Sequence, residues 1–144
     1  MIEQMNCEIL QKISEGKTLE QTYEETKAAF IFYSRELLRQ YDSNEPLLLF
    51  SSDCVRRIFK AEPLPSGKST YSNNVAKCCL RALLKYNTNL SQHGVAKLVG
   101  VTDHSSVASS ISMHEHYFKT SKSYAKKAAE VQSLIDQFKE QVKQ

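Results

Sequence analysis

The chain has 144 residues, of which 41% are hydrophobic and 24% charged, so it can bury a core. Only four Gly and three Pro are present, too few turn-forming residues for an all-β sandwich or barrel. No apolar run approaches the roughly 20 residues that span a bilayer, and the N-terminus lacks the basic-then-apolar pattern of a signal peptide. A soluble intracellular protein, located in the cytoplasm and without membrane contact, is therefore expected.

Charge is distributed unevenly along the chain. The formal net charge is +3, but residues 1–66 contain eight Lys and Arg against eleven Asp and Glu, and residues 67–144 contain eleven against five. The C-terminal half therefore has the sign that a polyanion-binding surface needs, although many basic surfaces are simply solvated.

Two helices are predicted in the N-terminal region. Apolar residues recur at helical spacing over residues 2–14, and the pattern stops at Gly16. A second helix begins at Thr18, with Gln21 completing a capping box, and continues to Tyr41. Its apolar stripe is either buried in a core or forms a dimer seam, because so short a region has little room to bury this many aromatics. The stripe consists of Leu19, Tyr23, Thr26, Phe30, Phe32, Tyr33, Leu37, Leu38 and Tyr41.

A third helix is predicted to begin at Asn44-Glu45-Pro46 and to continue to Phe59, because Pro is favoured in the first helical turn. Residues 63–72 contain two Pro and one Gly and are the expected linker. They include Gly67-Lys68-Ser69, but Glu62 stands where a phosphate-binding loop needs its first Gly. A nucleotide-binding loop is therefore not predicted.

The predicted fold is all-α, because almost every segment outside the linker has helical periodicity. A helical region over residues 1–62 precedes the linker, and a helix-turn-helix bundle follows over residues 73–144. The helices expected in this bundle are 75–87, 91–99, 103–118 and 124–142.

The residues from Ser91 to Val101 have the pattern of a helix that leads into a tight turn before a second helix. Ser91 can cap the first helix, and the small Ala96 lets the second helix approach closely. Gly100 stands four residues after Ala96, where the turn requires a positive φ. The positions expected to be buried in this pair are Val95, Val99 and Val101.

The second helix of this pair has an apolar side and a hydroxyl-rich side. The positions expected to face the core are Val107, Ile111, His114 and Phe118. The opposite side carries Thr102, Ser105, Ser106, Ser109 and Met113. A solvated helix face normally carries Glu and Lys, whereas short hydroxyl side chains allow close approach to the DNA major groove and hydrogen bonding there. The alternative is an undistinguished serine-rich helix.

Residues 101–107, Val-Thr-Asp-His-Ser-Ser-Val, resemble the G-R-D-H-T-T-V signature in the DNA-binding domain of the bacterial replication initiator DnaA. Ser91, Val95 and Gly100 match upstream positions of that domain at constant spacing, and its last helix is matched more loosely. The resemblance covers about residues 75–138 and implies an all-α fold related to the Trp repressor. It also implies sequence-specific binding of double-stranded DNA.

In that family, the Asp, His and first Thr of the signature reach base edges in the major groove. The resemblance assigns these roles to Asp103, His104 and Ser105, with Ser106 next to them. Chemically, an Asp can accept a hydrogen bond from a cytosine amino group, and a His can donate one to a purine acceptor.

The chain departs from the family pattern at several positions. Thr102 replaces the family's Arg, and both Thr of the signature are Ser, which removes methyl groups that touch thymine. Gln92 and His93 replace the Leu-Pro pair that opens the preceding helix, and Val101 replaces the second Gly. The stretch that corresponds to the family's Arg-rich minor-groove loop contains two Lys and no Arg. The initiator's ATPase portion has no counterpart in this sequence.

The chain is therefore predicted to bind double-stranded DNA through residues 91–118, in transcription control or in replication initiation, for example of a phage or a mobile element. Lys97, Lys119 and Lys122, together with two helix N-termini, are expected to hold phosphates. Residues 1–62 are expected to form a homodimer or to bind a protein partner. The alternative is a helical protein-interaction module, an adaptor or inhibitor, whose serine-rich face docks another protein. The candidate DNA contacts are Gln92, His93, Lys97, Thr102, Asp103, His104, Ser105, Ser106, Ser109, Lys119 and Lys122.

No enzyme, cofactor or metal site is predicted. Asp103, His104 and Ser105 are consecutive, so on a helix their side chains point about 100° apart and cannot form a catalytic triad. His114 and His116 are two residues apart, whereas helical metal ligands need a spacing of four, and His114 is expected to lie in the core. The cysteines form no C-x-x-C pair and are expected to be reduced, small, buried side chains. They are Cys7, Cys54, Cys78 and Cys79.

Overall fold

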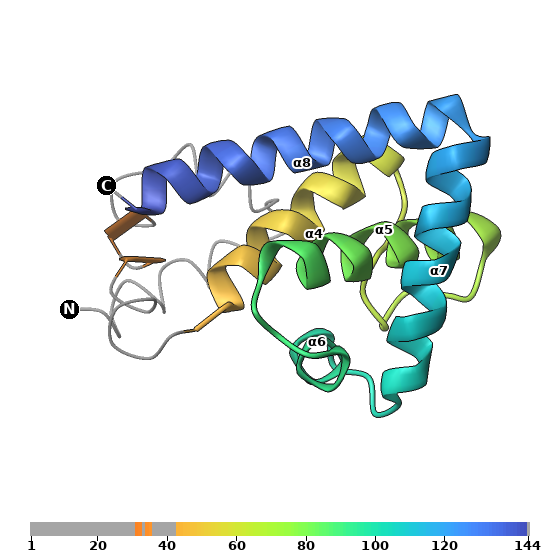
Figure 1. Cartoon of the computed structure of the whole chain (residues 1–144), viewed down its shortest axis with the longest axis horizontal. Coiled ribbons are helices and arrows are strands. Elements are labelled where there is room, and N and C mark those ends of the chain that lie inside the picture. The colour runs from red at the N-terminus through yellow and green to blue at the C-terminus, as the bar shows by residue number, and fades with distance from the viewer. Residues whose placement is uncertain (1–30, 33, 36–42, 144) are drawn as a thin grey trace.

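The computed structural model describes residues 31, 32, 34, 35 and 43–143. Over residues 43–143 the chain forms five α-helices and no β-strand, which confirms the predicted all-α fold class (Figure 1). The helices are α4 (Glu45–Phe59), α5 (Tyr71–Asn87), α6 (Gln92–Val99), α7 (His104–Thr120) and α8 (Lys122–Lys143).

Local sequence signals explain where these helices begin and end. Pro46 lies in the first turn of α4, as predicted, and Lys60 ends the helix in a left-handed conformation with φ of 53°. The helix α5 begins four residues earlier than predicted, because the Thr70 side chain accepts a hydrogen bond from the backbone N–H of Asn73 at 3.2 Å. Its predicted end at Asn87 is confirmed.

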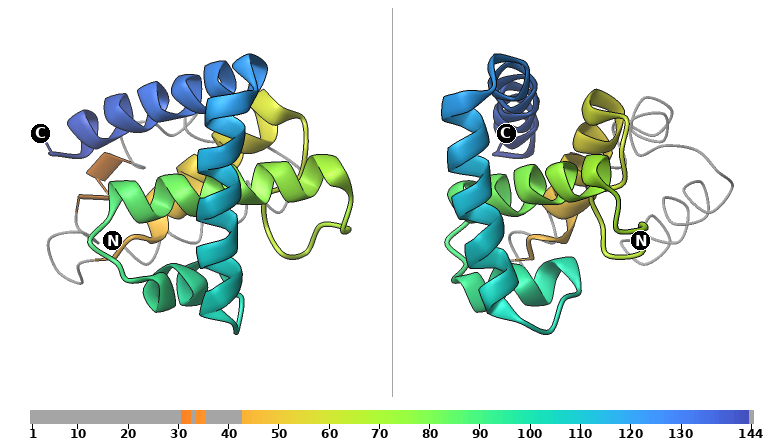
Figure 2. Two further views of the ribbon diagram at one scale, coloured as in Figure 1. Left: turned by 45° about the vertical axis from the view of Figure 1, so that its right-hand side comes forward. Right: turned by 90° about the vertical axis from the view of Figure 1, so that its right-hand side faces the viewer.

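The helix α5 lies at the centre of the fold. The helix α7 crosses it, and α4 and α8 lie side by side and pack against the same core (Figures 1 and 2). The short helix α6 lies beside the start of α7, at the opposite end of α7 from α8 (Figure 1). The largest apolar side chains with almost no exposure come from all five helices and are Leu80, Leu84, Ile135, Val55, Val95, Val107 and Val131.

The segment predicted as a linker joins two helices that share this core. Leu47 and Val55 of α4 belong to the same buried cluster as α5 and α8. Just before the segment, the Arg56 guanidinium donates to both oxygens of Glu62, at 2.8 and 3.0 Å. The side-chain oxygen of Asn73 then accepts from the backbone N–H of Glu62 at 2.9 Å. The chain from α4 to α5 is therefore held to both helices by hydrogen bonds.

A residue that precedes α4 in the chain contacts the end of α8. The Arg35 guanidinium donates to the carbonyl oxygens of Gln141 and Val142, at 2.9 and 3.2 Å. These carbonyls lie in the last turn of the helix, where backbone acceptors lack partners within the helix. Of the predicted apolar stripe over residues 19–41, Phe32 is 38% exposed and the other members lie outside the described residues, as do the predicted helix over 2–14 and Cys7.

The inward side of α7 is confirmed in part. Val107 and His114 are buried and Ile111 is half-buried, as predicted. Phe118 was expected to face the core, but it is 48% exposed, because it borders a hollow between α5, α7 and α8 that leaves part of its ring in contact with solvent. Ser110 is buried instead, since its small side chain fits at the crossing and its hydroxyl donates to the carbonyl of Ser106 at 2.8 Å.

His114 is a buried histidine with a hydrogen-bonded partner, as predicted. Its Nδ1 lies 2.6 Å from the hydroxyl of Tyr124, and the rings of Tyr86, Tyr124 and Phe118 surround it at centroid distances of 5.4–5.9 Å. Burial lowers the pKa of His114, and the nearby carboxylate of Glu115 opposes this effect only in part.

We expect the protein to lose stability as the pH falls below about 6.5, the ordinary pKa of histidine. Below this pH, the unfolded state binds a proton on His114 that the folded state resists. The contribution of His114 to the free energy of unfolding is therefore fully present above this pH and is lost as the pH falls below it. The loss from this residue is at most about 1.4 kcal/mol per pH unit. Urea denaturation at several pH values measures it, and the His114→Gln variant should lack this component. An unchanged pH dependence in the variant would contradict the assignment.

Candidate nucleic-acid interface

The turn between α6 and α7 has the geometry that the sequence predicts. The hydroxyl of Ser91 caps α6 by accepting from the backbone N–H of Gly94 at 3.1 Å. Gly100 ends α6 with a φ of 87°, and its N–H donates to the carbonyl of Ala96 at 3.0 Å. The N–H of Val101 donates to the same carbonyl at 2.9 Å. The chain is thus held by hydrogen bonds as it leaves α6.

We expect Gly100→Ala to lower the free energy of unfolding by about 1–2 kcal/mol, because an L-residue pays for the left-handed conformation. A Cβ built at this position meets no atom within 4 Å, so the backbone conformation alone accounts for the loss. Urea denaturation measures it. Gly100→Asn is the matched control, since Asn tolerates this conformation better and should cost less. Equal stability of the two variants would show that the turn does not keep its positive φ.

The two helices are held together by small buried side chains. Val95 and Val107 are fully buried, and Ala96 and Val99 are 3% and 5% exposed. Val101, also expected in the core, is only half-buried. This packing fixes the start of α7 relative to α6, so side chains on the first turns of both helices form one continuous surface.

Asp103 organises the start of α7. Its carboxylate accepts from the backbone N–H of Ser105 at 2.9 Å and from the Ser105 hydroxyl at 2.7 Å. These hydrogen bonds lower the pKa of Asp103, so the carboxylate is charged at neutral pH. The hydroxyl of Ser106 donates to the backbone carbonyl of Asp103 at 2.8 Å. Asp103 and Ser105 are exposed, and each keeps unused lone pairs that face solvent.

A pair of stacked histidines joins the two helices at this end. The rings of His93 in α6 and His104 in α7 lie 3.8 Å apart, centroid to centroid, with planes inclined by 28°. Both side chains are exposed. The sequence motif contains both residues, but the spacing along the chain does not reveal that they stack. The stack restricts the rotation of His104 and so orients its ring nitrogens.

The exposed side of α7 is uncharged over more than two turns. Thr102, Ser105 and Ser109 are exposed, Met113 is 40% exposed, and no Asp, Glu, Lys or Arg occurs between Asp103 and Glu115. Ser106 differs from the prediction, because it is half-buried and its hydroxyl is used within the turn. The predicted inward and outward sides of this part of α7 are otherwise confirmed.

The candidate contacts fall into two groups. His93 and Lys97 lie one turn apart on the exposed side of α6, with Gln92 beside them, and they share one end of the molecule with the start of α7. Lys119 and Lys122 are exposed but lie at the other end of α7, where it meets α8. Fifteen residues separate His104 from Lys119, which corresponds to about 22 Å along a helix.

Sequence reasoning missed Arg81. This arginine of α5 is only 8% exposed, and its Nη1 donates to the hydroxyl of Ser110 in α7 at 3.2 Å. The sequence does contain one signal for this residue, which is its place inside the apolar run Cys78-Cys79-Leu80-Arg81-Ala82-Leu83-Leu84. A charged residue in such a run is unusual, because charged side chains are rarely buried unless they are paired.

The fold and this surface define the class of the molecule: an all-α protein with a rigid pair of helices that presents a polar, hydroxyl-rich end. Comparison of the chain with protein-family models, with curated proteins and with solved structures finds no match. Among the described residues, no helix is both long enough and apolar enough to cross a membrane.

Proposed function

We propose that the chain binds double-stranded DNA in a sequence-specific manner, with the start of α7 in the major groove. The observation that carries the proposal is the combination of an exposed, charge-free run of short side chains with a helix start that bears Asp103 and His104. A major groove about 12 Å wide admits a helix of this kind, and short side chains let the helix backbone approach the bases.

Each side chain at this end has a chemical role in such a complex. Asp103 accepts a hydrogen bond from the amino group of cytosine, and His104 donates one to the N7 or O6 atom of a purine. The Ser109 hydroxyl can act as donor or acceptor, whereas the Ser105 hydroxyl already donates to Asp103 and presents acceptor lone pairs. These contacts specify sequence, whereas phosphate contacts set affinity.

In this proposal, phosphate contacts come from two places on the protein, one near the start of α7 and one at its far end. Lys97 and the first backbone N–H groups of α6, beside Gln92, lie near the start of α7 and hold the phosphates next to the groove. Lys119 and Lys122 lie too far along α7 to reach the same phosphates, so they contact the DNA backbone further from the start of α7. The proposed roles are transcription control or replication initiation, as in a phage or mobile element, without catalysis.

Selection of bound duplexes from random DNA tests the proposal with the full chain. A recurring sequence is expected, and its affinity should fall with salt with a log–log slope of about −0.9 for each phosphate neutralised. Enrichment of no sequence, together with no binding at low salt, would refute it. If no sequence is enriched but the affinity for duplexes falls steeply with salt, the chain binds DNA without sequence specificity, and the sequence-specific part of the proposal is refuted.

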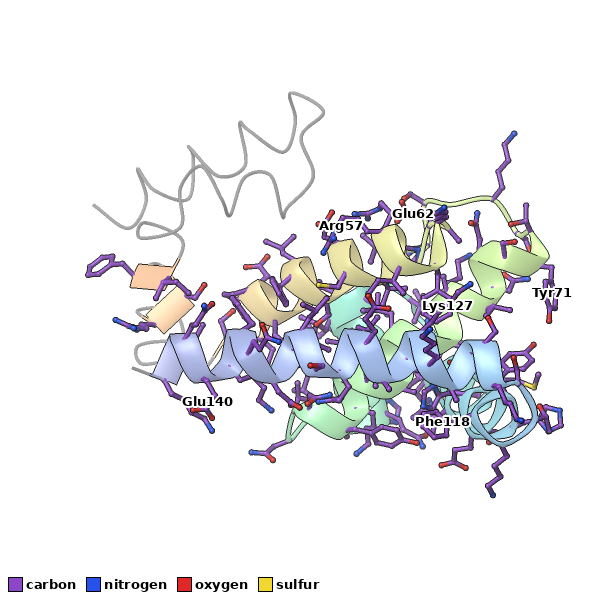
Figure 3. All side chains as sticks on the ribbon, turned by 90° about the horizontal axis from the view of Figure 1, so that it is seen from above. Arg57, Glu62, Tyr71, Phe118, Lys127 and Glu140 are labelled. Carbon is purple, nitrogen blue, oxygen red and sulfur yellow. The ribbon has the colours of Figure 1, made fainter. Side chains whose placement is uncertain are left out.

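A second candidate function is a helical protein-interaction module, and a specific hollow favours it. Between α5, α7 and α8 lies a largely apolar hollow of about 570 Å³, bordered by Tyr86 and Phe118, which are 53% and 48% exposed. Phe118 lies on the opposite side of α8 from Arg57 and Glu62 (Figure 3). Salt separates the two functions, because an apolar protein contact barely responds to ionic strength whereas DNA binding weakens steeply.

A further inference from the structure

Arg81 is a buried cation with incomplete hydrogen bonding. It lies in the middle of α5, where α7 crosses, and only 8% of its surface is exposed. Nη1 donates to Ser110, and Nε is buried without a hydrogen-bond partner among the described residues. The remaining nitrogen, Nη2, donates to no described residue and, unlike Nε, is not a buried atom without a partner, so it is the end of the guanidinium that a ligand can reach.

No carboxylate among the described residues forms an ion pair with Arg81. The other arginines of this region are different, because Arg56 and Arg57 form ion pairs with Asp53 and Glu62. The ionisable group that interacts most with Arg81 is the Cys78 thiol, and burial raises the pKa of that thiol. The thiol is therefore neutral at physiological pH and does not balance the guanidinium, which stays protonated.

The position of Arg81 relates it to the proposed DNA surface. Its partner Ser110 lies seven residues after Asp103, which corresponds to about 10 Å along α7. Ser110 is on the side of α7 that faces α5, next to the exposed side that carries Ser109. Lys77, one turn before Arg81 on α5, lies on the same side of that helix and adds a second positive charge.

We propose that Arg81 is the base of a phosphate-binding site, in which Nη2 binds one backbone phosphate of the DNA that holds α7. This inference rests on the proposed function. A helix in the major groove has a sugar–phosphate backbone on each side of it, and the start of α6 faces one of them. Arg81 on α5 reaches the other, and the phosphate supplies the negative charge that the described residues lack. Ser110 holds the guanidinium in place through Nη1.

The test measures duplex affinity as a function of salt for the full chain and for Arg81→Met, which keeps the packing and removes the charge. The variant should weaken binding to the selected sequence and to an unrelated duplex by the same factor, and its log–log slope should be less negative by about 0.9. The control Lys126→Met removes an exposed charge on α8 and should leave the slope unchanged. An unchanged slope in Arg81→Met overturns the inference while leaving the proposed function intact.

A second measurement uses inorganic phosphate and does not depend on DNA or on the folding of a variant. In the unmodified chain, the Nε–Hε resonance of Arg81 should shift on addition of inorganic phosphate but not of chloride at equal ionic strength. If the resonance shifts but no duplex binds, Arg81 is part of an anion site that takes free phosphate, and the proposed function is refuted. Equal responses to phosphate and chloride overturn the inference, whether or not DNA binds.

Discussion

Leu80→Ala should lower the free energy of unfolding by about 2–5 kcal/mol, measured by urea denaturation. Leu80 has no exposed surface and belongs to the core cluster that draws side chains from all five helices. The substitution removes apolar surface from the core and leaves a cavity that rigid helices cannot close completely. Because small domains have only about 5–15 kcal/mol of stability, this single change removes a large part of it.

The matched control for this prediction is Leu134→Ala in α8, which removes the same atoms from a half-buried position. It should cost clearly less, since the unmodified side chain is already partly in water and the space left by truncation opens to solvent. Equal losses for the two variants would mean that α5 is not the centre of the core.

Features that depend on neighbouring residues could be predicted from the sequence. The cap at Ser91, the positive φ at Gly100 and the start of α7 beside Asp103 all follow from interactions over two to four residues. The alternation of Val107 and Ser109 between core and solvent follows from the helical period alone. Local chemistry therefore determines the turn and the direction in which the start of α7 faces.

Features that depend on how helices cross could not be predicted. Phe118 was expected to face the core but is 48% exposed beside a hollow, whereas Ser110 is buried where Arg81 of α5 contacts it. The helical period alone does not show which of these positions another helix covers. The crossing of α5 and α7 also buries Arg81, and the pairing of α6 with α7 stacks His93 on His104.

For the candidate site, the sequence therefore indicates which residues lie at the start of α7, but not how the candidate contacts are arranged in space. The residues proposed to read bases, around Asp103, could be grouped from the sequence, because one helix start contains them. The residues proposed to hold phosphates could not be grouped in this way. The sequence assigns Lys97 and Lys119 to one surface only by their charge, and the structure places them at different ends of α7.

His104→Ala should reduce discrimination between the selected duplex and its single-base variants by about 1–3 kcal/mol at one base position. The imidazole is exposed at the first residue of α7, and its stacking on His93 at 3.8 Å holds the ring in one orientation, so a donor is aimed at a fixed point. Affinities for the selected duplex and for variants at each position, measured at one salt concentration, provide the readout. Affinity at all other positions should keep its rank order.

His116→Ala is the matched control, because it removes an exposed imidazole from the same helix about 18 Å from His104. It should leave base preference unchanged, which separates a contact at the groove from a general effect of losing a histidine on α7. His93→Ala tests whether the stack orients His104, in which case this variant should lose part of the preference at the same base position. A His104→Ala variant with the preference of the unmodified chain would remove His104 from base reading and leave the carboxylate of Asp103 to specify that position.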